Sequence, residues 1–138
     1  MNDQRRAWRA ATALVSIAGL ALVACGAATD DPVSDRLEHF HRAVASGDGE
    51  GACGDLAAEA RRSLESEEGK PCSEAILELG LPEPPGPGEV HRYGSMAQVR
   101  HEDDTAFLSR FDSGWRVVAV GCARQPDDKP YDCDIEVG

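Results

Sequence analysis

Histidines and carboxylates are the residues of this chain best suited to bind a metal or to move protons. His39 and His41 lie two positions apart in a stretch that predicts a helix, so their side chains point to different faces and cannot share a metal ion. His91 and His101 fall in segments that predict neighbouring strands, and the acidic residues 102–104 follow His101 directly. That cluster is suited to metal binding or acid–base chemistry. Because acidic residues also collect in hairpin turns, we expect a solvated turn there.

A second acidic group lies near the C-terminus. Calcium needs several oxygen ligands, which four neighbouring carboxylates can supply. The alternating D-x-D-x-D-G spacing of a calcium loop is absent, however, so the pattern favours a solvated acidic loop without a metal or cofactor. The four residues are Asp127, Asp128, Asp132 and Asp134.

No motif in the sequence points to an enzyme active site. A nucleophile elbow, a phosphate-binding glycine loop and an H-E-x-x-H helix are all missing from the sequence. Ser63, Ser66 and Ser73 have no histidine close to them in the chain. We therefore predict no catalytic residue and no enzymatic activity.

Four of the five cysteines form an even set, which is expected to pair outside the cytoplasm. Cys122 and Cys133 flank a loop of proline and aspartate residues that can fold back on itself, although three pairings are possible in principle. This favours a Cys122–Cys133 bridge and leaves Cys53 to pair with Cys72. No C-x-x-C spacing occurs, so structural bridges are predicted rather than a redox or zinc site.

The fifth cysteine, Cys25, ends a segment with the layout of a secretory signal. Residues 2–9 are basic, and residues 10–24 carry no charge. The segment closes with Leu-Val-Ala-Cys at residues 22–25, which resembles the lipobox of bacterial lipoproteins. The resemblance implies that Cys25 receives a diacylglycerol group and that residues 1–24 are removed as a signal peptide. The protein would then be anchored to the cell membrane by lipid, on its extracytoplasmic face.

An uncleaved transmembrane helix is the alternative for this segment. Residues 10–29 are uncharged and just reach the length needed to span a bilayer. The segment is rich in alanine, however, and its hydrophobicity is low for a permanent span, so a cleaved signal is favoured. Residues 25–34 would then hold the lipidated cysteine, a short tether and the start of the first helix, and residues 35–138 a single domain.

The composition limits the partners of that domain. The chain has 138 residues, 25 acidic against 14 basic side chains and a formal net charge of −11. An acidic surface argues against binding nucleic acid and against docking on anionic lipid without an anchor.

Helices are predicted in the first half of the domain. Asp31-Pro32 has the pattern of a helix start, and an apolar stripe continues to the glycines at 47 and 49. A single second helix is expected next, with Cys53, Leu56, Ala60 and Leu64 on one face. Ser73 is predicted to cap a short third helix that ends at Gly80.

Strands are predicted in the second half, joined by short polar turns that are typical of an antiparallel meander. We expect Val99, Ala106, Leu108, Val118 and Val120 on one sheet face, and Phe107, Phe111, Trp115 and Val117 on the other. The predicted strands are Glu89–Tyr93, Met96–Arg100, Thr105–Phe111 and Trp115–Gly121.

Helices followed by a curled four-stranded antiparallel sheet indicate the α+β class, with the helices packed on the sheet. The segment from Gly114 to Cys122, continued by residues 130–133 (Pro-Tyr-Asp-Cys), is similar to small extracytoplasmic lipoproteins of the cystatin-like or nuclear-transport-factor-two-like roll. That resemblance implies a roll built from helices and a curled sheet. The chain is shorter than the full roll by a pair of strands.

Three function hypotheses follow. The first is an interaction module that contacts another envelope component through the face around Phe107, Phe111 and Trp115. The second is a small ligand carrier or an enzyme of the SnoaL-like kind with an enclosed pocket. The third is a structural lipoprotein. The absence of catalytic motifs favours the first, with the membrane and an envelope protein as partners.

Overall fold

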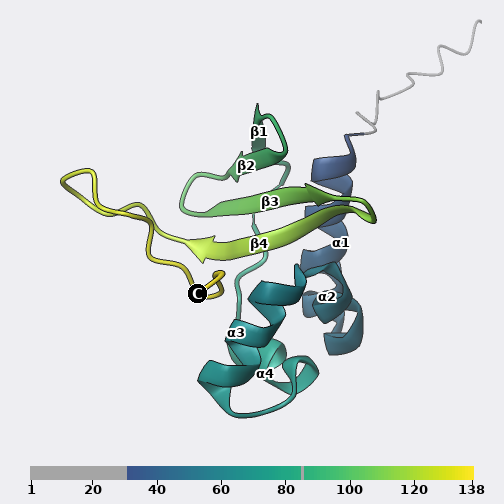
Figure 1. Cartoon of the computed structure of the whole chain (residues 1–138). Helices are drawn as coiled ribbons and strands as arrows, with labels where there is room; N and C mark the ends of the chain where they lie inside the picture. Colours follow the sequence, from purple (N-terminus) through teal and green to yellow (C-terminus); the bar gives the residue numbers. More distant parts are fainter. Residues whose placement is uncertain (1–30, 85) are drawn as a thin grey trace, which may run out of the picture.

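The computed structural model describes residues 31–84 and 86–138. The predictions for Cys25, for the signal peptide and for the tether up to residue 30 lie outside these residues. Within them, four helices precede one open antiparallel sheet with the strand order β1-β2-β3-β4, so the predicted α+β class is confirmed. The elements are α1 (Pro32–Ser46), α2 (Gly49–Asp55), α3 (Ala58–Glu68), α4 (Cys72–Glu78), β1 (Glu89–Tyr93), β2 (Met96–Arg100), β3 (Thr105–Phe111) and β4 (Gly114–Cys122) (Figure 1).

Helix α1 begins and ends where the sequence predicts. The Asp31 carboxylate accepts a hydrogen bond from the Val33 N–H at 2.9 Å, and Pro32 occupies the first turn. The helix ends at Gly47, whose φ of 77° is left-handed and whose N–H donates to the Val44 carbonyl. Its apolar stripe is buried against the sheet and the other helices.

The predicted single second helix is wrong, because the chain breaks into α2 and α3. Leu56 is extended, with φ −70° and ψ 148°, and forms a parallel bridge with Val117 of β4. The N–H of Ala57 donates to the Val117 carbonyl at 2.8 Å. A hydrogen bond to the sheet thus replaces one turn of helix. All four residues of the predicted stripe are nevertheless buried.

Both disulfides join the predicted cysteines. Cys53–Cys72 connects α2 to the first residue of α4, with the two Cα atoms 6.2 Å apart. Helix α4 therefore begins one residue before the predicted cap, Ser73. Cys122–Cys133 connects the end of β4 to the C-terminal tail.

The register of the sheet corrects the predicted faces. Leu108 of β3 lies opposite Val117, because irregularities in the β3–β4 pairing shift the two strands against each other. Trp115 and Val117 therefore share the helix-covered face with Leu108, and not the opposite face with Phe107 and Phe111.

The apolar core lies between that face of the sheet and the helices. The C-terminal tail completes it, because Ile135 is only 1% exposed and pairs with Val120 through two backbone hydrogen bonds. One face of the sheet is thus packed, and the other, called the outer face below, is covered only in part. Within residues 31–84 and 86–138, none of the helices has both the length and the hydrophobicity that a membrane span requires.

Candidate functional site

The structure separates the three aromatic residues that were predicted to form one interaction face. Trp115 is 8% exposed and lies on the packed face. Phe107 lies on the outer face but is half-buried, with the ring of Tyr131 from the tail at 5.2 Å in an edge-on arrangement. Phe111 is 43% exposed. The face as predicted is therefore wrong, since the shifted register turns Trp115 into the core.

The tail covers only one end of the outer face. Tyr131 accepts a hydrogen bond from the Gln98 side chain at 3.1 Å, and Gln98 is buried beneath it. At the opposite end, near the β1–β2 and β3–β4 turns, three large apolar side chains remain exposed: Tyr93, Met96 and Phe111. We call this group the apolar turn end.

The histidines are arranged differently from the sequence-based hypothesis. His91 lies opposite Gln98 on the outer face, whereas His101 comes one residue after β2 and contacts α1. Its ring lies against His41, with centroids 6.5 Å apart and planes at 88°. His91 and His101 therefore do not share a site. His39 and His41 do point apart, as predicted: His39 is exposed and His41 is 7% exposed.

His41 and His101 line a surface cavity of about 430 Å³. Its walls come from α1, from the segment of residues 83–88 as far as the model describes it, and from the end of β2. Leu37, Val99 and Pro84 supply apolar surface, while Glu38 and Arg42 contribute charged groups. The volume falls within the range of small-molecule sites. We call this the His41 cavity.

Gly88 permits the close approach that forms one wall of the His41 cavity. A Cβ atom at Gly88 would lie 2.5 Å from Val99 Cγ1 and 2.9 Å from His101 Nε2. Any larger residue would push the segment away from β2, so glycine is the residue that lets this wall form.

The two imidazoles are packed together without hydrogen-bond partners at one nitrogen each. Among the described residues, His41 Nε2 and His101 Nδ1 are buried and have no partner. Burial, and then the proximity of His101, lowers the pKa of His41 to about 4. His41 is therefore neutral at physiological pH, and the hydrogen-bonding capacity of its Nε2 is unmet.

His101 also borders a more polar depression of about 540 Å³, formed by the β2–β3 loop and the end of β4. Asp104 lies in it, and burial raises the pKa of its carboxyl group, against the opposing effects of the Thr105 and Cys122 N–H groups and of His101. His101 thus stands between a neutral histidine and a carboxyl group of raised pKa. Clusters of this kind are concentrated at functional sites.

A third polar cluster was missed by the sequence analysis. Asp55 is 2% exposed and forms an ion pair with Arg36 and a hydrogen bond with His39, both on α1. The distance between His39 Nδ1 and Asp55 Oδ2 is 2.5 Å. Because its partners are 16 and 19 positions away, no local pattern marked this residue. It joins α1 to α2, and neither Asp55 nor its two partners line the His41 cavity.

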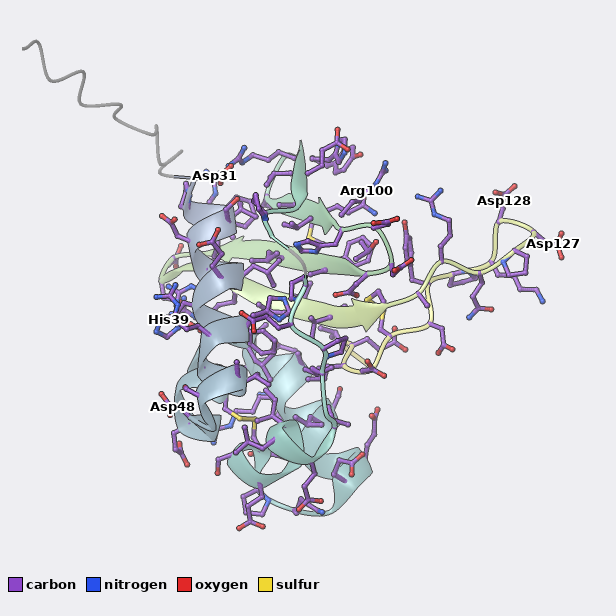
Figure 2. All side chains as sticks on the ribbon, turned by 180° about the vertical axis from the view of Figure 1, so that it is seen from behind. Asp31, His39, Asp48, Arg100, Asp127 and Asp128 are labelled. Atoms are coloured by element: carbon purple, nitrogen blue, oxygen red, sulfur yellow. A yellow bond between two sulfur atoms is a disulfide. The ribbon has the colours of Figure 1, made fainter. Side chains whose placement is uncertain are left out.

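The carboxylates of the acidic tail loop are spread along it. Asp127 and Asp128 lie at the loop tip, away from the sheet (Figure 2), whereas Asp134 lies beside Gly121 at the base. In the described residues, no group of three or more His, Cys, Asp or Glu side chains is placed to hold a metal ion.

Comparison with known proteins assigns no family. No family model matches the chain, and no curated protein is similar to it in sequence. Among solved structures, the chain is similar to a variant of Rv3472, described as a function unknown protein from Mycobacterium tuberculosis. The sequence identity is 10% and the TM-score 0.34, with 78% of this chain and 69% of that chain covered.

Proposed function

We propose that this protein is a lipid-anchored extracytoplasmic binding module that takes a small ligand in the His41 cavity. The observation that carries the proposal is the cavity itself, in which apolar walls surround a buried, neutral histidine. The second part of the proposal, the lipid anchor at Cys25, rests on the resemblance to the lipobox.

The lining indicates the class of ligand. Leu37 and Val99 favour an apolar body, and the charged groups of Glu38, Arg42 and Glu83 favour a polar group on the same molecule. An apolar molecule with one or two hydrogen-bonding groups fits both parts. The acidic net charge of the chain disfavours an anionic ligand.

Binding is favoured over catalysis because the unpartnered nitrogen of each ring is buried. A catalytic group must come within hydrogen-bond distance of the substrate. His41 Nε2 and His101 Nδ1 are shielded from solvent, so neither nitrogen is exposed to a molecule in the cavity. The imidazole rings of His41 and His101 instead form part of the cavity wall, which a ligand would contact through their polarizable faces.

The anchor is tested by changing Cys25 to Ser in the full-length precursor. We expect the wild-type protein in the membrane fraction, and Cys25→Ser either released or left as an unprocessed precursor, because stable anchoring needs the attached lipid chains. The control changes Cys122 and Cys133 to Ser together, which should leave the protein membrane-bound. Normal processing and membrane attachment of Cys25→Ser would refute the anchor.

The binding site is tested by filling the cavity. Ser34 lines it from the first turn of α1, whereas Ser46 is exposed at the other end of the same helix. Ser34→Trp should block the cavity, and Ser46→Trp is the matched control. Binding of small apolar alcohols, amides and ketones is measured by ligand-observed NMR.

We expect compounds that bind the wild-type protein and Ser46→Trp but lose binding at least tenfold in Ser34→Trp, since the introduced indole occupies their volume. If Ser34→Trp binds the same compounds with unchanged affinity, the His41 cavity is not the ligand site. If no compound binds the wild-type protein, the binding proposal fails as well.

A further inference from the structure

The apolar turn end is the largest group of exposed apolar side chains on the sheet. Tyr93 is 61% exposed, Met96 42% and Phe111 43%. Tyr93 and Met96 are directly paired across the β1–β2 hairpin, and Met96 pairs with Ser109, two residues before Phe111. The three side chains therefore lie on the same outer face, at the same end of the sheet. Contiguous apolar surface of this kind marks a contact site.

The chain enters the domain at the same end of the sheet as this group, but on the helix-covered face, since Arg92 pairs with the buried Ala97 and Tyr93 with Met96. Asp31, at the start of α1, forms an ion pair with Arg92, the residue next to Tyr93. The Arg92 guanidinium and the Val33 N–H outweigh burial, so that the pKa of Asp31 lies below its usual range. The β1–β2 hairpin and the start of α1 are thus linked, while α3 and α4 lie at the opposite end of the molecule (Figure 1).

The sequence limits the distance from this end to a lipid attached at Cys25. Cys25 precedes Asp31 by six positions, and an extended chain spans at most about 3.5 Å per residue, so the separation is at most about 20 Å. A surface at the chain entry therefore stays within reach of a bilayer that holds Cys25, whereas α3 and α4 lie at the opposite end of the domain.

The charges near the apolar turn end differ from those of the rest of the chain. The two hairpins that form it carry more basic than acidic side chains, although the whole chain has a net charge of −11. The residues concerned are Arg92, Arg100, Arg110 and Arg116 against Glu89 and Asp112, with Arg92 paired to Asp31. This end is thus the part of an acidic domain that is least repelled by anionic headgroups, and tyrosine and phenylalanine side chains suit the membrane interface.

We infer that the apolar turn end docks on the lipid surface that holds the Cys25 anchor. This inference rests on the lipid anchor proposed above. The anchor provides the attachment, and the contact of Tyr93, Met96 and Phe111 with the headgroup region sets the orientation of the domain. The His41 cavity then has a constant position relative to the membrane.

The test places a tryptophan on either end of the domain. Phe111→Trp marks the apolar turn end, and Leu77→Trp marks α4, where Leu77 is 37% exposed. Both positions are exposed, so neither change disturbs the core. The full-length lipidated variants are inserted into phosphatidylethanolamine–phosphatidylglycerol vesicles with brominated acyl chains, which quench nearby tryptophans. Trp115 is present in both variants and provides a common background.

We expect the added emission of Phe111→Trp to fall at least about twofold in brominated vesicles, because the indole reaches the interface. Leu77→Trp should be unchanged. Flotation of the vesicles with bound protein tests the lipid anchor separately from the docking of the apolar turn end. If both variants float and are quenched equally or not at all, the docking inference is overturned while the anchor stands. If neither floats, the anchor proposal fails and the inference fails with it.

Discussion

At the scale of single residues, two buried polar side chains, Asp55 next to α1 and His41 on α1, differ in whether their polar atoms have partners. Asp55 is held by Arg36 and His39, so its carboxylate is fully paired. His41 is buried with one ring nitrogen unpartnered, next to the ring of His101. The first arrangement stabilises the fold, whereas the second leaves polar capacity unused at the wall of a cavity. The binding site is placed at His41 because the cavity lies there, and the unpartnered nitrogen itself is buried.

The buried histidine predicts a pH dependence of stability. The pKa of His41 is lowered to about 4 in the folded state, so the unfolded chain binds a proton at higher pH than the folded one. Its contribution to stability is full above about pH 6.5 and is lost as the pH falls towards 4, by about 3 kcal/mol. The free energy of unfolding, measured by urea denaturation at several pH values, should show this fall.

The variant His41→Phe isolates that effect. Because phenylalanine does not titrate, the variant should lose less stability than the wild-type protein over the same pH interval. The difference between the two pH profiles is the measured quantity, which removes the contribution of the many carboxylates common to both. Parallel profiles would show that His41 does not resist protonation in the folded state.

At the scale of elements, the division between α2 and α3 shows where local pattern and tertiary contact compete. The sequence from Cys53 to Leu64 has the apolar spacing of one helix, and its residues are helix-compatible. The chain nevertheless extends at Leu56 and Ala57 and pairs with β4. In the sheet, the Val117 carbonyl accepts a hydrogen bond from the Ala57 N–H, which would bond within the helix if the helix were continuous. The spacing of neighbouring residues contains no information about an acceptor that lies 60 residues further along the chain.

This pairing is tested by proline substitution at adjacent positions. The φ of Ala57 is −62°, which suits proline, but Ala57→Pro removes the N–H that donates to Val117. We expect a loss of about 1–2 kcal/mol in the free energy of unfolding. Ala58→Pro is the control, because Ala58 is exposed at the first position of α3, where proline is tolerated.

Hydrogen exchange provides an independent measurement. The Ala57 amide should be protected in the native protein, whereas that of Ala58 should exchange quickly, since the first N–H groups of a helix have no partner in the helix. Equal exchange of the two amides would contradict the pairing with β4.

At the scale of the whole molecule, the C-terminal tail determines which surfaces are open. It pairs with β4 through Val120 and Ile135, and its Tyr131 covers one end of the outer face. At the other end of the outer face Tyr93, Met96 and Phe111 stay exposed. On the sheet, the tail thus leaves exposed apolar side chains only at the end where the chain enters the domain.

The contribution of the tail to the core is tested at Ile135. Ile135 is 1% exposed, so Ile135→Ala should lower the free energy of unfolding by about 2–4 kcal/mol through lost burial and a residual cavity. Val137→Ala is the matched control: Val137 is 43% exposed, and its truncation should change stability by less than about 0.5 kcal/mol. Equal effects of the two substitutions would mean that the tail does not form part of the core.

The sequence by itself determined the features that depend on neighbouring residues. The α+β order, the start and end of α1, the four strands and the pairing of the cysteines follow from caps, apolar spacing, turn residues and cysteine parity, all of which act over short stretches of chain. The tertiary structure alone decided the face of Trp115, the break at Leu56, the pairing of Asp55 and the contact between His41 and His101. Each of these depends on a register or on a partner far along the chain, and burial and hydrogen bonding select such partners only when the whole domain has folded.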